Sequence, residues 1–390
     1  MTTFTSIDII LLSVTGVCFL VQLLYYLMYF AKPVRYGKKT LEENATNDTF
    51  INANNERPGI SVIVCAKNES ENLKQFLPVL LTQDYPLYEV IVVNDGSTDT
   101  SDEVLRMLAK QYPHLYSTYI PEHAKYLSRK KLAITIGLKA AKYDCLLFTE
   151  PNCFPVSNNW IKLMASHFNE QTDIVLGFST FSKSTGFWSK YASYDNLFSG
   201  LKYLSFALSK KPYKGIGRNM AYKKELYYSN NGFSSHLNLF PGEDDLFINQ
   251  CANKINVAVE VSPESITTTF VEGLQYWKET KICQFTTQRH YRFGPVAFWN
   301  LELFSRIFFY FSLAALIVCG WPDWKFTAIA GAFYFIRFSL QSWVMHQTSS
   351  FWSIDKFTFT LPLFDLFQPV VNLYFYCSRI FKGRKDYAWR

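Results

Sequence analysis

A short run of β-branched residues that ends in a carboxylate constrains this chain more than any other feature. Val90 to Val93 are consecutive β-branched residues, which predicts a buried strand of a parallel sheet. Asn94, Asp95 and Gly96 follow, and these residue types end a strand in a turn. Ligands of open α/β sheets bind beyond the carboxyl ends of the strands, so Asp95 is placed where a ligand binds. An Asx turn that caps the next helix accounts for the same residues equally well.

Strands and helices alternate from Gly59 to about Ile266, which predicts an α/β domain with a mostly parallel sheet. The predicted strands are Ile60 to Cys65, Val90 to Val93, Cys145 to Thr149 and Ile174 to Phe178, and the predicted helices are Glu71 to Leu81 and Thr100 to Tyr112.

Composition divides the chain into a soluble part and a membrane part. Of its 390 residues, 49% are hydrophobic and 18% aromatic, and the aromatic residues concentrate toward the C-terminus. The net charge of +7 is mild and forms no basic stripe, so we expect no nucleic-acid partner. The eight cysteines show no CxxC and no His/Cys ligand spacing, which argues against a zinc site and favours a reducing compartment.

The N-terminal segment is a candidate membrane span. Ile9 to Ala31 carries no charge and is long enough to cross a bilayer. A cleaved signal peptide is the alternative, but a basic start and a small-residue cleavage site are missing. The basic cluster that begins at Lys32 follows the span, so Met1 is expected outside and the remainder begins in the cytoplasm. We expect an anchor over residues 1–35 and a linker over 36–58.

The C-terminal region, 293–390, changes character again and follows a soluble domain predicted over 59–292. Ile307 to Gly320 with its flanks and Phe326 to Met345 are two candidate spans. Phe357 to Cys377 is also apolar but is interrupted by Pro362, Asp365 and Pro369, so we interpret it as interfacial or re-entrant. Two returning spans keep the basic C-terminal tail inside. Arg337 lies within a span, where we expect a helix-packing role rather than transport.

Polar motifs follow one another in a definite order along the domain. The first strand runs into the turn Ala66-Lys67-Asn68-Glu69. The later motifs are Lys130-Lys131, Glu150-Pro151-Asn152, Gly217-Arg218-Asn219 and Gly242-Glu243-Asp244-Asp245.

Together with Asp95, these motifs resemble a family 2 glycosyltransferase of the inverting, nucleotide-sugar-dependent type, in its membrane-anchored bacterial branch. The resemblance covers Ile60 to Tyr291 and implies a glycosyltransferase A-type nucleotide-binding sheet. The residues that it assigns to the nucleotide are Ala66, Asn68, Glu69, Asp95, Lys130 and, at the ribose, Glu150.

Inverting transfer needs a carboxylate that takes the acceptor's hydroxyl proton, and cations that stabilise charge on the departing diphosphate. The resemblance makes Asp244 the base, with Glu243 beside it in the catalytic site. Lys130 and Arg218 are candidate cations, and Arg218 and Asn219 belong to the phosphate or acceptor side. The alternative for the acidic residues is an N-cap of the following helix.

One departure from the family concerns the metal. Where the family has Asp-x-Asp, this chain has Glu150-Pro151-Asn152, and neutral Asn152 is a weak ligand for Mg²⁺ or Mn²⁺. Three readings stay open: the metal is held with help from Glu150 and phosphates, cations of the protein replace it, or catalysis is lost.

A second departure concerns processivity. Processive relatives carry Gln-x-x-Arg-Trp, which Gln284 and the segment Gln288 to Tyr291 do not match, so single-sugar transfer is favoured. Arg289 and His290 are candidates for contact with the pyrophosphate or acceptor, or they form one face of an interfacial helix.

We therefore expect an enzyme of the bacterial inner membrane with a cytoplasmic catalytic domain. Its donor would be a UDP- or GDP-linked sugar and its acceptor lipid-linked or membrane-proximal, in cell-envelope polysaccharide or glycolipid assembly, with membrane lipids as the other partner. The alternative is a non-catalytic pseudo-glycosyltransferase that binds nucleotide or scaffolds envelope biosynthesis enzymes.

Overall fold

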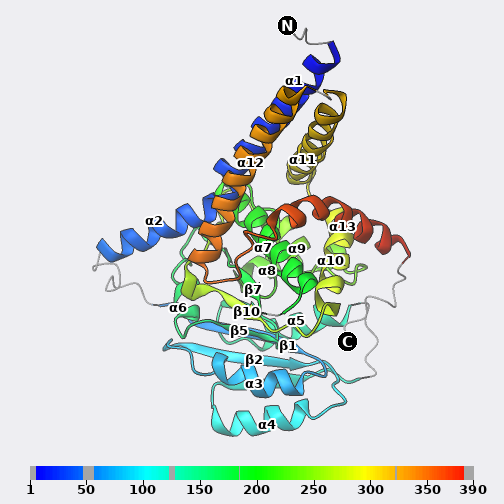
Figure 1. Cartoon of the computed structure of the whole chain (residues 1–390). Helices are drawn as coiled ribbons and strands as arrows, with labels where there is room; N and C mark the ends of the chain where they lie inside the picture. Colours follow the sequence, from blue (N-terminus) through cyan, green and yellow to red (C-terminus); the bar gives the residue numbers. More distant parts are fainter. Residues whose placement is uncertain (1–5, 47–56, 123–127, 184, 321–322, 382–390) are drawn as a thin grey trace.

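The computed structural model describes residues 6–46, 57–122, 128–183, 185–320 and 323–381. An α/β domain forms the lower body in Figure 1, and a stalk of helices rises from it. Residues 47–56 of the expected linker and the basic C-terminal residues from Lys382 onward lie outside the described residues.

The main sheet has seven strands in the order β3-β2-β1-β4-β8-β6-β9. The strands are β1 (Ile60–Ala66), β2 (Tyr88–Asn94), β3 (Leu115–Tyr119), β4 (Cys145–Thr149), β6 (Ile174–Leu176), β8 (Met220–Lys223) and β9 (Val257–Val259). Strands β1 to β4 are parallel, and only β8 runs antiparallel to its neighbours. The mostly parallel sheet is confirmed. β6 stops before Phe178, because the Phe178 carbonyl accepts from the Asn219 side chain at 2.8 Å.

Both faces of the sheet are covered, which is why β1 is buried along its whole length. Val62 and Val64 of β1 pack on one face in a cluster with α3 (Ser70–Leu80), α4 (Ser101–Gln111) and α6 (Trp160–Ala165). Ile63 and Cys65 face the opposite side, against α5 (Arg129–Ala140) and α7 (Phe187–Leu208). This alternation follows from the two-residue period of a strand.

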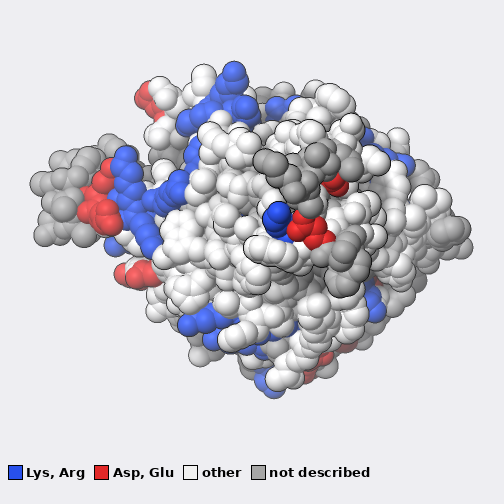
Figure 2. All heavy atoms as spheres, turned by 45° about the horizontal axis from the view of Figure 1, so that its top comes forward, with Lys and Arg blue, Asp and Glu red and all other residues white. Residues whose placement is uncertain are grey.

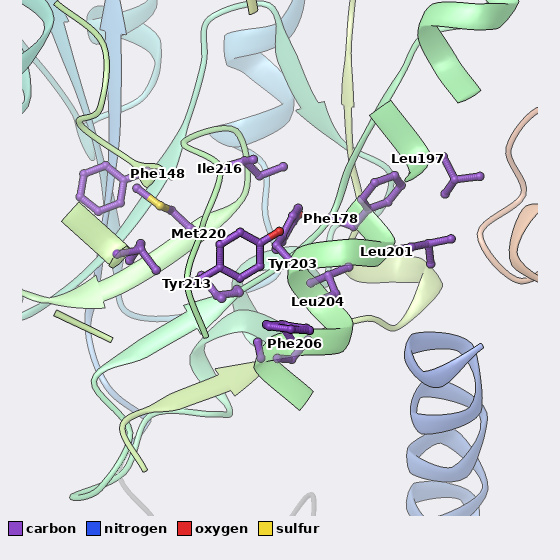
Figure 3. Packing of buried hydrophobic residues seen from close by; sticks show 14 of the residues in the cluster. Phe148, Phe178, Leu197, Leu201, Tyr203, Leu204, Phe206, Tyr213, Ile216 and Met220 are labelled. Carbon is purple, nitrogen blue, oxygen red and sulfur yellow. The ribbon is translucent and has the colours of Figure 1, made fainter. Parts of the chain in front are cut away.

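A second, three-stranded sheet in the order β5-β10-β7 lies beside the first. Its strands are β5 (Cys153–Pro155), β10 (Thr267–Thr269) and β7 (Ser179–Phe181). The shorter helices of the domain are α8 (Lys224–Ser229), α9 (Asp245–Cys251) and α10 (Gln275–Gln288), with 3-10 turns at Ser234–His236 and Pro263–Ser265. The buried α7 packs on the loop before β8: Tyr203, Ile216 and Met220 belong to one core cluster (Figure 3).

The stalk consists of α1 (Ser6–Leu24), α11 (Phe293–Cys319) and α12 (Trp324–Phe351), which extend together from the domain (Figure 1). Phe19, Phe309 and Ala330, one from each helix, share a small apolar core. Among the described residues, two helical segments are long and apolar enough to cross a membrane. One is Ser6–Glu43, which joins α1 to the helical residues that follow it, and the other is Phe293–Cys319, which is α11. The expected span over Phe326 to Met345 in α12 is not one of them and stays a prediction.

Two further helices, α2 (Lys32–Thr46) and α13 (Leu361–Phe381), leave the base of the stalk sideways (Figure 1). A π-helical turn, Tyr25–Phe30, leads from α1 into α2, so the expected linker is helical up to Thr46. α2 carries the basic cluster, seen along the arm at the left of Figure 2, where uncharged atoms cover much of the face around the stalk.

The interrupted third C-terminal segment is one helix, α13 (Leu361–Phe381), lying across the body below the stalk (Figure 1). Pro362 is tolerated because the first helical turn needs no N–H partner there. Asp365 is buried in ion pairs rather than breaking the helix.

A buried ionic network joins the stalk helices to α13. Asp365 lies 3.1 Å from Arg306 of α11 and 2.8 Å from Arg337 of α12. Arg337 also donates to the Gln22 side chain of α1 at 3.0 Å. Arg337 is therefore a helix-packing residue, as the sequence predicted.

Replacing Asp365 with alanine tests this network. Asp365→Ala leaves the buried Arg337 guanidinium without its carboxylate partner and leaves Arg306 with Glu302 alone, at 3.4 Å, so it is expected to cost about 3–5 kcal/mol of stability. The measurement is denaturant unfolding in detergent micelles. The control is Asp102→Ala, which breaks an exposed pair with Arg106 at 2.6 Å and is expected to cost less than about 1 kcal/mol. Equal effects of the two changes would contradict the prediction.

Candidate active site

Hydrogen bonds join the turns that follow β1 and β2. The N–H of Asp95 donates to the carbonyl of Ala66 at 2.8 Å. Asn68 has a positive φ of 53°, which turns the chain toward the neighbouring strand end. Its N–H donates to Ser97 Oγ at 2.9 Å, and its side-chain oxygen accepts from the N–H of Thr98 at 2.8 Å. The structure thus brings Ala66, Asn68 and Asp95 together.

The buried Asp95 carboxylate has a partner that sequence reasoning missed. Arg129, the first residue of α5, donates from Nη2 at 2.6 Å and from Nε at 2.8 Å to Asp95 Oδ1. The Asx-turn alternative is wrong for Asp95: Asn94 makes that turn, and Asp99 accepts from the N–H groups that begin α3 and α4. Arg129 stands beside the predicted Lys130, which is the only local signal that pointed to it.

Glu69 completes the first turn. Its carboxylate accepts from Asn72 Nδ2 at 2.5 Å. Burial raises the pKa of Glu69, and the nearby Glu150 carboxylate raises it further. Glu69 therefore lies within electrostatic range of the carboxylates at the end of β4.

Lys130 is the centre of the site. Its Nζ lies 3.1 Å from Glu150 Oε1, after β4, and 2.8 Å from Glu243 Oε1, before α9. Burial disfavours the ammonium form, but the carboxylates of Glu243 and Glu150 outweigh it and raise the pKa of Lys130 well above its usual value. Lys130 is thus a permanent cation that joins two of the predicted motifs.

Glu150 uses both of its oxygens. Oε1 meets Lys130, and Oε2 accepts from the hydroxyl of Tyr276 in α10 at 2.6 Å. Burial by itself raises its pKa, but Lys130 and Arg218 outweigh burial and lower the pKa of Glu150. The Glu150 carboxylate is therefore ionised. Its partner Tyr276 was not predicted from the sequence, because it lies far along the chain from Glu150.

Asp244 lies between the glycine-containing loop and α9. Its Oδ2 accepts from the N–H of Gly217 at 2.8 Å, and its Oδ1 from the N–H of Asp245 at 2.6 Å. The predicted helix cap is therefore real. Burial, followed by the carboxylates of Asp245 and Glu243, raises the pKa of Asp244 to about 7. With this pKa, the Asp244 carboxyl group can gain or lose a proton near neutral pH, so the same group can cap α9 and take part in proton transfer.

Asp245 ties the acidic motif to α10. Its Oδ2 accepts from the hydroxyls of Thr287 and Tyr291, both at 2.5 Å. The predicted Arg289 and His290, which lie between them in sequence, are exposed, and Arg289 Nε donates to His290 Nε2 at 3.0 Å. The structure does not bring Arg289 and His290 to the cluster, and Thr287 and Tyr291 contact it instead.

Arg218 and Asn219 differ although they are neighbours. Arg218 donates to Thr269 at 3.2 Å and Asn196 at 2.9 Å, which are neutral partners, and lies near enough to Glu150 to affect its pKa. Asn219 is fully buried and its amide bonds Trp160 and two backbone carbonyls. Arg218 thus belongs to the site, and Asn219 holds the surrounding chain together.

Lys131 anchors the loop that leads to the acidic motif. Its buried Nζ donates to the carbonyls of His236, Leu239 and Pro241, at 2.7, 2.6 and 3.2 Å. Burial lowers the pKa of Lys131 to about 8, so the ammonium with its three donors prevails at neutral pH. The two adjacent lysines at the start of α5 therefore differ in role: Lys130 pairs with the carboxylates of the site, and Lys131 anchors the loop that precedes the acidic motif.

The residues at the end of β4 do not fit a divalent cation. Asn152 Nδ2 donates to the carbonyl of Phe270 at 3.0 Å, which commits its amide to the backbone. Glu150 is already paired with Lys130 and Tyr276. Within the described ranges, no group of three or more His, Cys, Asp and Glu side chains is arranged to hold a metal ion.

Comparison with known proteins identifies related sequences. The family described as "Glycosyl transferase family 2" matches residues 61–229. An uncharacterized glycosyltransferase, YibD of Escherichia coli, is 26% identical over 27% of this chain and 30% of its own length. Glycosyltransferase AglE of Haloferax volcanii is 29% identical over 36% of this chain and 46% of its own length. The matches thus span less than half of each of these two relatives.

A solved structure shares the fold over most of the chain. The mannosyltransferase PcManGT from Pyrobaculum calidifontis, in complex with GDP-Man and Mn²⁺, superposes with a TM-score of 0.52 at 16% identity. The superposition covers 87% of this chain and 95% of that one. At this identity the likeness shows the fold, a glycosyltransferase A-type sheet with flanking helices.

Replacing Lys131 with methionine tests its anchoring role. Lys131→Met leaves buried carbonyls unpaired and is expected to cost about 1–3 kcal/mol of stability. Hydrogen exchange of residues 236–241 should accelerate, whereas Lys139→Met, an exposed lysine of the same helix, should change neither quantity. Unchanged exchange in 236–241 would rule out the anchor.

Proposed function

Because residues 61–229 make this chain a member of glycosyltransferase family 2, we propose that it transfers a single sugar, with inversion, from a UDP- or GDP-linked donor to a lipid-linked acceptor. The protein would act at the bacterial inner membrane with its catalytic domain in the cytoplasm, in the assembly of envelope polysaccharide or glycolipid. One observation carries the proposal: a partly buried carboxylate, Asp244, with a pKa of about 7, lies near the cationic Lys130.

The donor would bind across the ends of β1, β2 and β4. Asn68 and Asp95 would hold the nucleoside, because their turns are already joined and form the carboxyl edge of the parallel strands. Glu150 would meet the ribose, and Lys130 and Arg218 would face the diphosphate. The mannosyltransferase of the same fold binds GDP-Man, which is a donor of this chemical class.

In the transfer step, the acceptor hydroxyl oxygen attacks the anomeric carbon as the bond from that carbon to the diphosphate breaks. The acceptor proton passes to the Asp244 carboxylate, and the electron pair of the broken bond stays on the phosphate oxygen. Lys130 and Arg218 stabilise that developing charge. Glu243 contributes by holding Lys130 in place at 2.8 Å.

The acceptor side points to the membrane. α10, which binds Asp245 through Thr287, packs on α13: the rings of Trp277 and Phe375 lie 5.2 Å apart. α13 carries exposed apolar side chains on the side away from these contacts, such as Val370 at 63% and Leu373 at 62% exposed. These are the features of a helix that lies at a bilayer surface. A lipid-linked acceptor would reach the site along this side.

Asp244→Asn tests the base. The amide cannot take a proton, so we expect transfer to fall at least about 100-fold, with UDP or GDP binding retained. In the wild type the rate should rise with pH, because only deprotonated Asp244 is active; with a pKa of about 7, the rate should drop about fivefold from pH 7 to pH 6. Donor turnover by the purified protein is the measurement.

Asp102→Asn, an exposed carboxylate of α4, is the matched control and should behave as wild type. Unchanged activity of Asp244→Asn would remove Asp244 as the base. Nucleotide binding by the wild type without turnover under any condition would favour the non-catalytic alternative.

Native cysteines test the proposed membrane orientation. Cys319 ends α11 at the far end of the stalk and is exposed, so it should lie outside. A membrane-impermeant maleimide should label Cys319 on intact cells, and Cys319→Ala should abolish that labelling. Cys377 of α13, also exposed in the structure, should react only after the membrane is opened. Labelling of Cys319 only in opened cells would reverse the orientation.

A further inference from the structure

We propose that Lys130 takes the place of the divalent cation at the donor diphosphate, so that nucleotide binding and transfer proceed without metal. This inference rests on the proposed function and specifies how the same site handles the leaving group.

Asn152 is not available as a metal ligand. Its amide nitrogen donates to the Phe270 carbonyl at 3.0 Å, and its backbone carbonyl accepts from the N–H of Phe270 at 2.7 Å. These paired bonds join the start of β5 to the end of β10. The thiol of Cys153 donates to the remaining amide oxygen at 3.6 Å. Asn152 is therefore a structural residue of the small sheet.

The neighbouring Glu150 is also committed. A metal bound at Oε1 would lie beside the Lys130 ammonium, 3.1 Å away, and like charges repel at that range. A metal bound at Oε2 would compete with the Tyr276 hydroxyl, which donates at 2.6 Å. Both oxygens of Glu150 are therefore engaged, so Glu150 offers a divalent cation neither of the carboxylate ligands that would normally complement phosphate oxygens and water.

Lys130 has the charge and the free donor that the diphosphate needs. An ammonium group has three protons, and Glu150 and Glu243 accept two of them. The side chain is 26% exposed, so the ammonium group is accessible to a ligand. The two carboxylates also fix the ammonium in position before a ligand arrives, which is the preorganisation that charge stabilisation requires.

Arg218 is a second cation suited to the same diphosphate. Its partners are the neutral side chains of Thr269 and Asn196, and the ring of Phe181 lies 5.0 Å from its guanidinium carbon. In the part of the chain that the structure describes, Arg218 forms no ion pair with a carboxylate, although Glu150 lies near enough for each group to shift the pKa of the other. Lys130 and Arg218 thus place two cationic groups near the end of β4, with the Lys130 charge shared by Glu150 and Glu243.

Calorimetric binding of UDP and of GDP to the full-length protein in detergent tests the inference. With EDTA present, the wild-type dissociation constant should lie within about threefold of its value in Mn²⁺. Lys130→Met should weaken metal-free binding more than tenfold, and Lys130→Arg, which keeps the charge, should retain most of it. Lys139→Met on the exposed side of α5 should match the wild type. Thermal unfolding of each variant verifies folding.

The outcomes separate the inference from the proposed function. Binding in Mn²⁺ that disappears in EDTA would overturn the inference alone. Metal-free binding that is unchanged in a folded Lys130→Met variant would remove Lys130 from the role. Absence of UDP and GDP binding in both conditions, together with no donor turnover, would overturn the proposed function as well.

Discussion

The ammonium group of Lys130 holds together two parts of the chain that the remaining site depends on. Glu150 ends the fourth strand of the parallel sheet, and Glu243 precedes α9, almost a hundred residues later by their numbers. Glu243 is buried and Glu150 is partly buried, and without a cation between them the two carboxylates would repel each other in a medium of low dielectric. The single positive charge therefore joins the end of β4 to the acidic motif. The same ammonium group also lowers the pKa of the neighbouring Asp244, which burial and the carboxylates of Asp245 and Glu243 raise.

The acidic motif is fixed by α10 as well. Asp245 accepts from Thr287 and Tyr291, so α10 cannot move without disturbing the residue next to the base. α10 in turn packs on α13, which the buried Asp365 ties to the stalk. A series of contacts thus leads from the stalk to the acidic motif: the ion pairs of Asp365, the ring packing of α10 on α13, and the hydrogen bonds of Asp245.

Local pattern was enough for β1, β2 and β4 and for the residues at their ends, whereas β3, β5 and β7 to β10 were not predicted. The β-branched run before Asp95 could only be a buried strand, and a carboxylate at the end of a parallel strand lies at the ligand edge. Partners from elsewhere in the chain could not be predicted: nothing in the sequence shows that Arg129 folds back on Asp95. Asn219 illustrates the same limit, because its motif suggested a ligand contact and only the packing shows an amide bonded on all sides. α2 was missed because its polar composition resembles a linker.

By itself, the sequence indicated the resemblance to glycosyltransferase family 2, the mostly parallel sheet, the order of the motifs and the weak metal ligand at Asn152, because each of these is a property of residue type and spacing. The tertiary structure determined which charged side chains form ion pairs. The pairing of Lys130 with two carboxylates, and the burial that brings the pKa of Asp244 to about 7, arise from segments far apart in the chain. Electrostatic interactions depend on distance in space and on exclusion of water, and neither quantity is written in local sequence.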